Sequence, residues 1–388
     1  MFKIRTMNKI SRHGLELFPR DKYEVASEIP NPDAILVRSA DLHSVEIPET
    51  VIAIARAGAG YNNIPIGLCS SRGISVFNTP GGNANAVKEL AIAALLLSSR
   101  DIVGGINWCK SISDKADHVP EIVESEKIRF EGPELRGKTL GVIGLGAVGV
   151  IVANDAVSLG MDVIGYDPFI SVDAAWRLSR AVGKADTLEG LLAKADYITL
   201  HLPLNDATKG LLDEEKFRFM KKGTRIINLS RGGLVNEADI IDALNYGKVA
   251  SYVTDFPTAE LLACPKVIPV PHLGATTPEA EDNCAIMAVQ QIMCYLETGG
   301  IKNSVNFPGC GLDKRAPHRI TAVNSNIPNM VGQIATILAG EEINIMDLIN
   351  HHRGEYAYNI IDTEQEICAE SLRRISNIEG VIRVRRVD

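Results

Sequence analysis

The segment from Lys138 to Gly149, KTLGVIGLGAVG, constrains the fold of this chain more than any other. Its residues 139–143 are apolar or β-branched apart from one glycine, which is typical of a strand buried on both faces. Residues 148–159 continue with apolar side chains at helical spacing, so we expect a strand that leads through a turn into a helix. Three glycines lie in this turn: Gly144, Gly146 and Gly149.

Glycines at this spacing have separate tasks in a strand-to-helix turn. The first permits the tight turn, the second lets the backbone approach a pyrophosphate, and the third lets the helix pack closely on the strand. The N–H groups at the start of the helix then bind the pyrophosphate. Glycine-rich turns are common, so the motif alone is weak evidence, but its context predicts a dinucleotide-binding domain of the Rossmann type.

An acidic residue, Asp167, follows the second apolar strand, which is expected at residues 161–166. An acid at this position accepts hydrogen bonds from both ribose hydroxyls of NAD and would repel the additional phosphate of NADP. No Lys or Arg follows in residues 168–170 to bind such a phosphate. NAD is therefore the expected cofactor. The alternative, that Asp167 is only a turn residue before Pro168, stays open.

Composition excludes several classes of partner. The 388 residues are enough for two or three domains, and a net charge of −8 argues against nucleic acid or an anionic membrane. The seven cysteines are scattered without a CxxC pair, which suits reduced thiols in the cytoplasm, and no metal site is expected. No leader is expected, and the longest apolar run, residues 90–97, is far shorter than the ~18 residues of a membrane span.

The first part of the chain alternates short apolar segments with loops. Strands are expected at residues 34–37, 51–55 and 74–77, and each is followed by a polar or glycine-rich loop. Parallel strands present ligand groups at their carboxyl ends, so these loops together could bind a small anion. Each loop taken alone is more often a structural turn.

Two long helices determine the expected domain organisation. Residues 83–100 predict a buried helix that crosses to the next domain, and residues 279–298 predict a helix long enough to return. We expect a discontinuous domain of residues 1–95 and 286–308, a dinucleotide-binding domain of residues 96–285, and a small unit of residues 318–388 after a hinge at 307–317.

Three ionisable residues in the second half of the chain fit one reaction: Arg231, Glu260 and His272. Taken singly, each of these residue types is more often structural or solvated. Oxidation of a 2-hydroxy acid requires a guanidinium that holds the carboxylate, a base that takes the hydroxyl proton, and a carboxylate that orients this base. Arginine, histidine and glutamate supply these groups, and histidine has the pKa nearest neutrality.

A series of motifs resembles the D-isomer-specific 2-hydroxyacid dehydrogenase family over nearly the whole chain. They are LRGKTLGVIGLGAVG, HLPLNDATKGLL, NLSRGGLVNE, TDFPTAE and PHLGATT, accompanied by RAGAGYNNIP and NTPGGNANAVKEL. The resemblance implies an α/β fold with a Rossmann-type NAD-binding domain, a discontinuous flavodoxin-like substrate domain and a C-terminal ferredoxin-like ACT domain. It also implies NAD-dependent oxidation of a small anionic D-2-hydroxy acid, first of all 3-phospho-D-glycerate to 3-phosphohydroxypyruvate in L-serine biosynthesis.

The resemblance also implies roles for individual residues. Arg231 would bind the substrate carboxylate, His272 would act as acid and base, and Glu260 would hydrogen-bond the imidazole. One departure concerns the last of these, because the chain reads DFPTAE from Asp255 where members commonly read DVFxxEP, so the loop that carries Glu260 can run differently.

Further contacts are implied for substrate and cofactor. The substrate anchors are Arg38 and Ser39, and Asn83 lies in a loop that approaches the substrate. The cofactor contacts are Gly144, Gly146, Ala147, Val148, Gly149, Asp167, Leu229, Ser230, Arg231, Asp255, His272, Leu273, Gly274 and Ala275.

The C-terminal residues, from 319 onward, predict the order strand, helix, strand, strand, helix, strand, which is the ferredoxin-like plan. Their resemblance to an ACT domain implies association with a second copy, as a homodimer or homotetramer, and L-serine as an effector. The implied effector contacts are Asn324, Asn326 and Asn344. An Asn side chain both donates and accepts hydrogen bonds, as a zwitterion requires, but these asparagines could equally serve only to turn the chain. The family usually has glycine where Asn329 stands.

Two other functions stay open. The substrate could be another acidic D-2-hydroxy acid, such as glycerate or 2-hydroxyglutarate, because pocket shape sets this choice. From a different class, the chain could be an NAD-sensing protein that resembles a corepressor and binds the cofactor without turnover. The presence of all three ionisable residues speaks against this second alternative.

Overall fold

The computed structural model describes residues 1–312 and 316–387, which form a mixed α/β fold as the resemblance implied. Contacts divide the chain into two compact units, one of Met1–Asn83 with the chain from Pro278 onward, and one of Ala84–Thr277. The borders differ from the predicted boundaries at 95/96 and 285/286. The reason at the first border is helix α3 (Ala84–Ser99), which buries Ala91, Ala94 and Leu95 in the core of the second unit.

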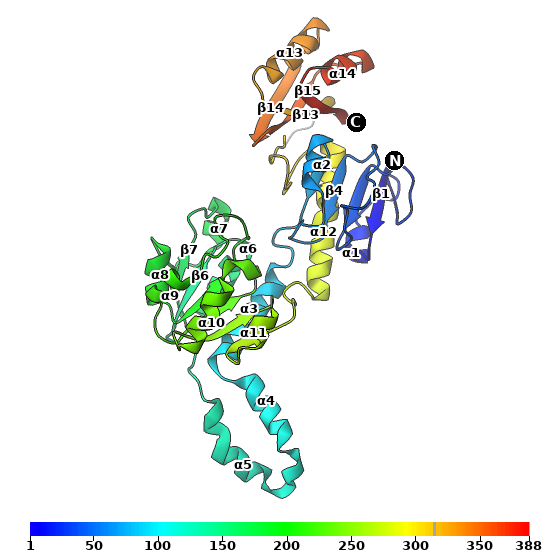
Figure 1. Cartoon of the computed structure of the whole chain (residues 1–388). Coiled ribbons are helices and arrows are strands. Elements are labelled where there is room, and N and C mark those ends of the chain that lie inside the picture. The colour runs from blue at the N-terminus through cyan, green and yellow to red at the C-terminus, as the bar shows by residue number, and fades with distance from the viewer. Residues whose placement is uncertain (313–315, 388) are drawn as a thin grey trace. The chain divides into compact units, whose positions relative to one another are not determined.

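The unit of residues 84–277 is built on a seven-stranded parallel sheet in the order β12-β11-β10-β9-β6-β7-β8 (Figure 1). This order is that of a Rossmann domain with one added strand, so the predicted class is confirmed. The strands are β6 (Thr139–Ile143), β7 (Asp162–Tyr166), β8 (Gly183–Lys184), β9 (Tyr197–Leu200), β10 (Thr224–Asn228), β11 (Val249–Thr254) and β12 (Val267–Pro269).

Helices cover this sheet, and polar caps determine where several of them begin. They are α6 (Ala147–Ser158), α7 (Val172–Arg177), α8 (Leu188–Lys194), α9 (Glu214–Phe219), α10 (Glu237–Asn245) and α11 (Ala259–Leu262), with a 3-10 turn η3 (Gly232–Leu234). Asn236 caps α10 as predicted, because its side chain accepts the N–H of Asp239 at 3.2 Å. Strand β6 is buried from Leu140 to Ile143, which agrees with its apolar sequence.

One part of this unit was not predicted as regular structure. Helices α4 (Ile102–Ser111) and α5 (Val119–Glu126), with 3-10 turns η1 (Ser113–His118) and η2 (Lys127–Phe130), form an arm that projects from the rest of the unit (Figure 1). Neither α4 nor α5 contains a buried residue. Without a core to face, the sequence of the arm has no clear apolar stripe, so its periodicity does not reveal the helices.

The other unit contains a five-stranded parallel sheet in the order β2-β1-β3-β4-β5. This is the flavodoxin-like order, as predicted. The elements are β1 (Phe2–Met7), β2 (Tyr23–Ala26), β3 (Ala34–Val37), β4 (Ala53–Arg56), β5 (Ser75–Phe77), α1 (Arg12–Leu15), α2 (Ile66–Ser71) and the returning helix α12 (Pro278–Thr298). Within residues 1–312 and 316–387, no helix has both the length and the apolar character of a membrane span.

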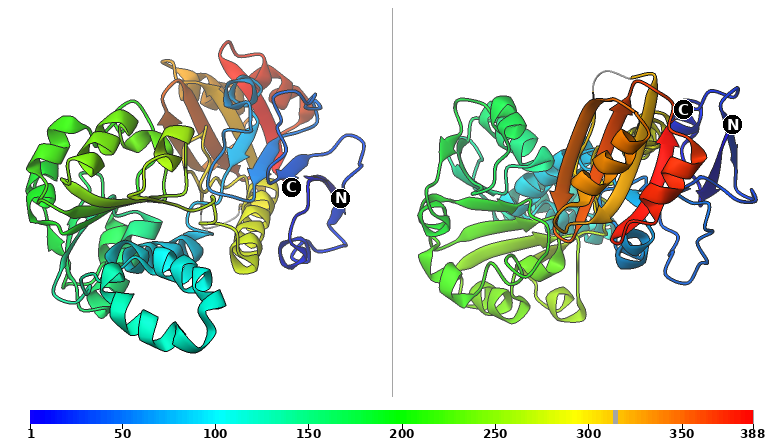
Figure 2. Two further views of the ribbon diagram at one scale, coloured as in Figure 1. Left: turned by 60° about the horizontal axis from the view of Figure 1, so that its bottom comes forward. Right: turned by 90° about the horizontal axis from the view of Figure 1, so that it is seen from above.

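The same unit contains a second, four-stranded antiparallel sheet in the order β14-β15-β13-β16. Its elements are β13 (His318–Ser325), α13 (Met330–Gly340), β14 (Ile345–Arg353), β15 (Tyr356–Thr363), α14 (Ala369–Ser376) and β16 (Val381–Val387), which confirms the ferredoxin-like plan. Both helices lie on one face of the sheet (Figure 2) and enclose Ile320, Ile334 and Ile375.

The other face of this C-terminal sheet packs on the end of α12. Tyr358 and Tyr295 belong to one core cluster, with ring centroids 6.5 Å apart. We predicted a hinge at residues 307–317 in front of this sheet, and residues 313–315 of it lie outside the described part of the chain. The described flanking residues include Phe307, which is fully buried in the same cluster. The C-terminal sheet is therefore part of a continuous core.

Candidate active site

The glycine turn between β6 and α6 has the geometry that a bound pyrophosphate requires. Gly144 has φ +91°, and a Cβ there would lie 2.5 Å from the carbonyl oxygen of His201. Gly146 caps α6, and a Cβ on it would meet no protein atom within 4 Å, so the backbone is open to a ligand. A Cβ on Gly149 would overlap the carbonyl oxygen of Gly144, so only glycine lets the helix pack this closely.

The Asp167 carboxylate is held beside this turn by backbone N–H groups. Its Oδ2 accepts the N–H of Leu145 at 2.8 Å, and its Oδ1 accepts the N–H of Phe169 at 2.9 Å. Each carboxylate oxygen can accept a second hydrogen bond. Asp167 is therefore oriented at the end of β7 and still has acceptor capacity for a pair of hydroxyl groups.

The Asp255 carboxylate is buried directly after β11. The residue is 2% exposed, and neither side-chain oxygen has a hydrogen-bond partner among the residues that the structure describes. Burial raises the pKa of Asp255, while the charge of His272, the backbone N–H of Asp255 itself and the charge of Arg231 act to lower it. Asp255 thus lies within the influence of the two residues predicted to carry the chemistry.

A buried carboxylate without a donor is costly unless a ligand supplies one. The primary amide of a nicotinamide ring is a donor of the right kind, and the open backbone at Gly146 suits the pyrophosphate of the same cofactor. The residues present in this unit therefore fit a nicotinamide dinucleotide.

Arg231 lies on a loop whose shape depends on a buried asparagine at the end of β10. The Nδ2 of Asn228 donates to the carbonyl oxygen of Arg231 at 2.9 Å, and its Oδ1 accepts the N–H of Ser230 at 3.2 Å. Ser230 Oγ also donates to the carbonyl oxygen of Leu200 at 2.5 Å. Asn228 was missed in the sequence, although an amide that ends a buried apolar strand is a signal of such a role.

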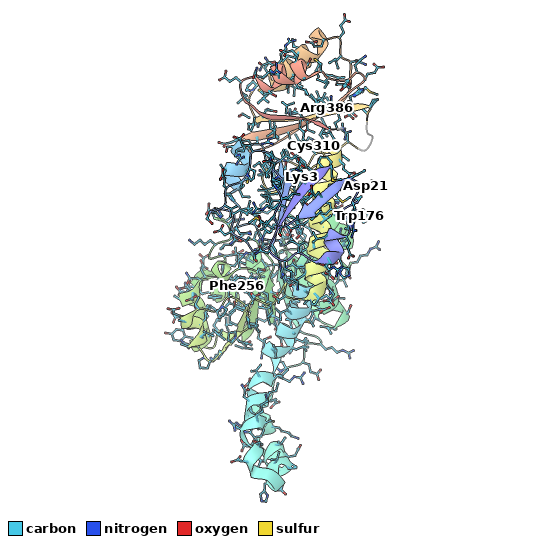
Figure 3. All side chains as sticks on the ribbon, turned by 90° about the vertical axis from the view of Figure 1, so that its right-hand side faces the viewer. Lys3, Asp21, Trp176, Phe256, Cys310 and Arg386 are labelled. Carbon is cyan, nitrogen blue, oxygen red and sulfur yellow. The ribbon has the colours of Figure 1, made fainter. Side chains whose placement is uncertain are left out.

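The imidazole of His272 is exposed and lies against the ring of Phe256, with centroids 4.8 Å apart. Phe256 itself is labelled in Figure 3. Phe256 was also missed in the sequence analysis. Glu260 is exposed on α11, and within the described residues no hydrogen bond joins it to the imidazole. The predicted contact between Glu260 and His272 is therefore not formed in this structure, and an orienting role for Glu260 stays a prediction.

The predicted substrate anchors belong to the other unit. Arg38 follows β3, and its Nη2 lies 2.6 Å from Oε1 of Glu281 on α12. Asn8, with φ +68°, accepts the N–H groups of Ser39 at 3.2 Å and Ala40 at 2.5 Å, which shapes this loop. Asn83 is the last residue of the unit before α3.

The predicted effector residues do not meet within one copy of the chain. Asn324 is buried and accepts from Asn359 at 2.7 Å, while its own Nδ2 donates to the carbonyl oxygen of Ser325. Asn324 pairs with Ala357 of β15, whereas β14 begins after Asn344 opposite Thr363. Six residues of strand separate these positions, or ~20 Å.

The structure also places a histidine beneath the nucleotide turn that the sequence analysis did not single out. The Nε2 of His201 lies 3.0 Å from Oγ1 of Thr199, and removal of the ring from solvent lowers its pKa from 6.5 to about 4. His201 is therefore neutral in the folded protein at pH 5 to 7.

This shift predicts a stability change with pH. Below pH 6.5 the unfolded chain binds a proton at His201 that the folded protein does not bind until about pH 4. As the pH is lowered from 6.5 toward 4, the free energy of unfolding is therefore expected to fall by about 1.4 kcal/mol for each pH unit. Urea unfolding of His201→Gln at pH 7 and pH 4.5 should show less acid destabilisation than wild type. Exposed His352→Gln is the control, and equal pH dependence in all three proteins would contradict the prediction.

Residues 95–274 match the model of the D-isomer specific 2-hydroxyacid dehydrogenase, NAD binding domain. These residues are therefore similar to the NAD-binding domain of that family, and they lie in the unit that contains the glycine turn. A D-3-phosphoglycerate dehydrogenase of Archaeoglobus fulgidus is 36% identical over 310 residues, which cover 76% of this chain and 56% of that protein. Another, from Methanocaldococcus jannaschii, is 34% identical over 348 residues, which cover 87% and 62%.

Among solved structures, the NAD⁺-bound 3-phosphoglycerate dehydrogenase of Entamoeba histolytica is similar, with 27% identity and a TM-score of 0.60. The match covers 79% of this chain and 98% of that one. The chain spans less than two thirds of the length of both curated relatives.

Proposed function

We propose that this protein is an NAD-dependent dehydrogenase that oxidises 3-phospho-D-glycerate to 3-phosphohydroxypyruvate, the first step of L-serine biosynthesis. The observation that carries the proposal is the buried carboxylate of Asp255, which has no hydrogen-bond partner in another described residue and lies in the unit that contains the glycine turn. The relatives named above support the choice of substrate, since two curated relatives and one solved structure have this activity in their names.

The proposed chemistry assigns a task to each residue. Arg231 holds the substrate carboxylate with its guanidinium, which can form two parallel hydrogen bonds. His272 takes the proton of the C2 hydroxyl as the C–O bond becomes a carbonyl. When bound, the nicotinamide ring supplies the acceptor for the hydride that leaves C2. Arg38, Ser39 and Asn83 are proposed to bind the other anionic end of the substrate.

Turnover tests this function directly. NADH formation is followed at 340 nm, a wavelength specific to the reduced ring, with a panel of D-2-hydroxy acids that includes 3-phosphoglycerate, glycerate and 2-hydroxyglutarate. We expect the highest kcat/KM for 3-phosphoglycerate. A higher value for another acid would transfer the proposal to that substrate, and NAD binding without turnover of any acid would favour an NAD-sensing protein.

Cofactor choice gives a second prediction, because Asp167 has no basic neighbour. We expect wild type to prefer NAD over NADP, and Asp167→Ala to narrow that preference mainly by raising KM for NAD about tenfold, since two ribose hydrogen bonds are lost. Steady-state kinetics with both cofactors measure this. Asp173→Ala, which removes a nearby exposed carboxylate on α7, is the charge-matched control. Equal use of both cofactors by wild type would refute the assignment.

The quaternary and regulatory expectations also stay proposals. The α4–α5 arm exposes Ile106 at 50% and Ile128 at 72%, and burial of such apolar area supports a homo-oligomer.

Asn344 and Asn326 could contact one L-serine only if each came from a different copy. Sedimentation tests the assembly, and calorimetry with L-serine tests the effector. If calorimetry shows no binding of L-serine, the effector proposal fails and subunit association is the role that stays proposed for the C-terminal sheet. Reduced cysteines still suggest a cytoplasmic location.

A further inference from the structure

The guanidinium of Arg38 is already paired before any substrate arrives. Its Nη2 lies 2.6 Å from Oε1 of Glu281, and each side chain is 35% exposed. We infer that Glu281 is a positioning residue that holds Arg38 in the orientation in which it binds the anionic end of the substrate. The inference rests on the proposed function, because Arg38 is a substrate anchor only in that proposal.

The geometry of the pair favours holding over blocking. A guanidinium has five N–H donors in a fixed fork, and the contact with Glu281 joins one nitrogen to one oxygen. The remaining donors can bind a carboxylate or a phosphate while Glu281 stays in place. A long Arg side chain otherwise loses rotamer entropy when it binds, so orientation in advance improves affinity.

Glu281 itself is held because the first turns of α12 pack closely against helix α1 and the loop after β5. Cys284, one turn further along the helix, contacts the loop after β5 so closely that a Cβ on Gly82 would lie 2.8 Å from its Sγ. Across the helix, a Cβ on Gly14 would lie 2.7 Å from Cβ of Ala285. The start of α12 therefore cannot shift without moving these neighbours.

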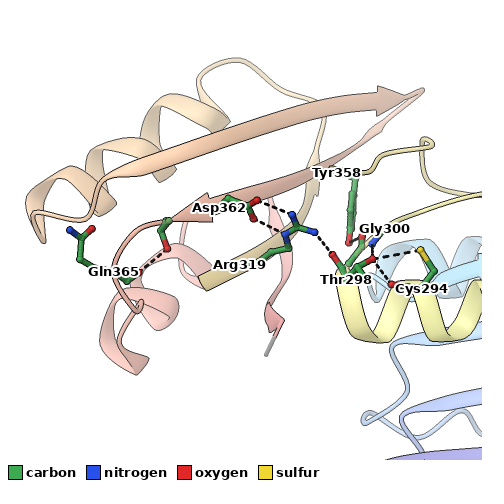
Figure 4. Close-up of polar contacts among 9 residues, drawn as sticks. Cys294, Thr298, Gly300, Arg319, Tyr358, Asp362 and Gln365 are labelled. Atoms are coloured by element: carbon green, nitrogen blue, oxygen red, sulfur yellow. Dashed lines mark hydrogen bonds and ion pairs between the residues drawn. The ribbon is translucent and has the colours of Figure 1, made fainter. Parts of the chain in front are cut away.

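The far end of α12 is held by the C-terminal sheet (Figure 4). Arg319 donates to the carbonyl oxygen of Thr298 at 2.9 Å, and Tyr358 donates to that of Gly299 at 2.7 Å. Arg385 donates to the carbonyl oxygens of the preceding turn and lies 4.7 Å over the ring of Tyr295. These bonds satisfy carbonyl groups that a helix end leaves without partners. Glu281 is thus presented from a helix whose two ends are fixed.

Substitutions at two adjacent positions of α12 test the inference by the direction of the KM change. Glu281→Ala should raise KM for 3-phosphoglycerate about two- to fivefold, the range expected for a half-exposed ion pair, with kcat and KM for NAD unchanged. Glu281→Gln should recover most of the wild-type KM, because its amide oxygen has the same reach toward Nη2 of Arg38. Asp282→Ala is the matched control, since Asp282 pairs with Ser11 and His13 instead, and its KM should not change.

Two results would overturn the inference: a lower KM in Glu281→Ala, which would make Glu281 a competitor of the substrate, and a KM equal to that of Asp282→Ala. If wild type turns over no acid of the panel, the proposed function fails separately. Calorimetry with inorganic phosphate on the same four proteins then decides the inference. Weaker binding in Glu281→Ala alone supports it, and equal affinity in all four proteins overturns it.

Discussion

His272→Ala is expected to lower kcat about 10²- to 10⁴-fold while NAD still binds, because a general base contributes acceleration of that size. The imidazole is exposed on the loop that begins after β12 and lies tilted against the ring of Phe256, so its removal leaves the core of the domain intact. Steady-state kinetics with 3-phosphoglycerate measure kcat, and calorimetry measures the dissociation constant of NAD.

Near wild-type turnover in His272→Ala would remove His272 from the chemistry. The exposed histidine His352 provides the control, since His352→Ala should leave kcat unchanged. A third variant, Glu260→Gln, tests whether Glu260 orients the imidazole of His272. If the hydrogen bond to the imidazole forms only when ligands are bound, this variant should lose activity as well; if it never forms, kcat should stay close to wild type.

Asp362→Ala is expected to lower the free energy of unfolding of the N- and C-terminal unit by about 3–5 kcal/mol. Asp362 accepts from Nε of Arg319 at 2.6 Å and from Nη2 at 2.8 Å, and Arg319 is 1% exposed (Figure 4). The hydrogen bonds to Asp362 raise the pKa of Arg319 above its usual value. The variant leaves a buried guanidinium without its carboxylate, which is the costly arrangement. Urea unfolding monitored by circular dichroism measures the loss.

The control for this prediction is an exposed ion pair on a helix that packs on the same C-terminal sheet. Glu370→Ala breaks the ion pair of Glu370 with Arg373 on α14, where both side chains are at least 64% exposed, and should cost less than about 1 kcal/mol. If Asp362→Ala fails to fold, the double variant Arg319→Met/Asp362→Leu should fold, since an apolar pair of similar volume often replaces a buried ion pair without loss. A loss in Asp362→Ala no larger than in Glu370→Ala would contradict the prediction.

Most regular elements could be predicted because their signals are local. The turn at Gly144, the strand that precedes it and the helix that follows are determined within a short segment by apolar pattern and glycine spacing. The first two strands, β1 and β2, were missed because polar residues such as Lys3, Arg5 and Glu24 interrupt their apolar pattern.

The site could be predicted in part. Residue types and the family resemblance indicated Asp167, Arg231, Asp255 and His272, and the first three of these follow strands that the sequence predicted. They could not indicate that Asp255 has no partner in another described residue, that the ring of Phe256 lies against the imidazole, or that no hydrogen bond joins Glu260 to that imidazole within the described part of the chain. These facts depend on side-chain direction and on burial by neighbouring segments, neither of which has a periodic signature.

By itself, then, the sequence determined most strands of the three sheets, the nucleotide turn and the identity of the ionisable groups, since these depend on propensities and spacings between near neighbours. Only the tertiary structure decided which distant groups meet. Glu281 reaches Arg38 because α12 returns to the five-stranded sheet, and Arg319 caps that helix because the C-terminal sheet packs on its end. Such contacts form between segments far apart in the chain, where the burial of apolar surface around Tyr295 and Tyr358 selects the partners.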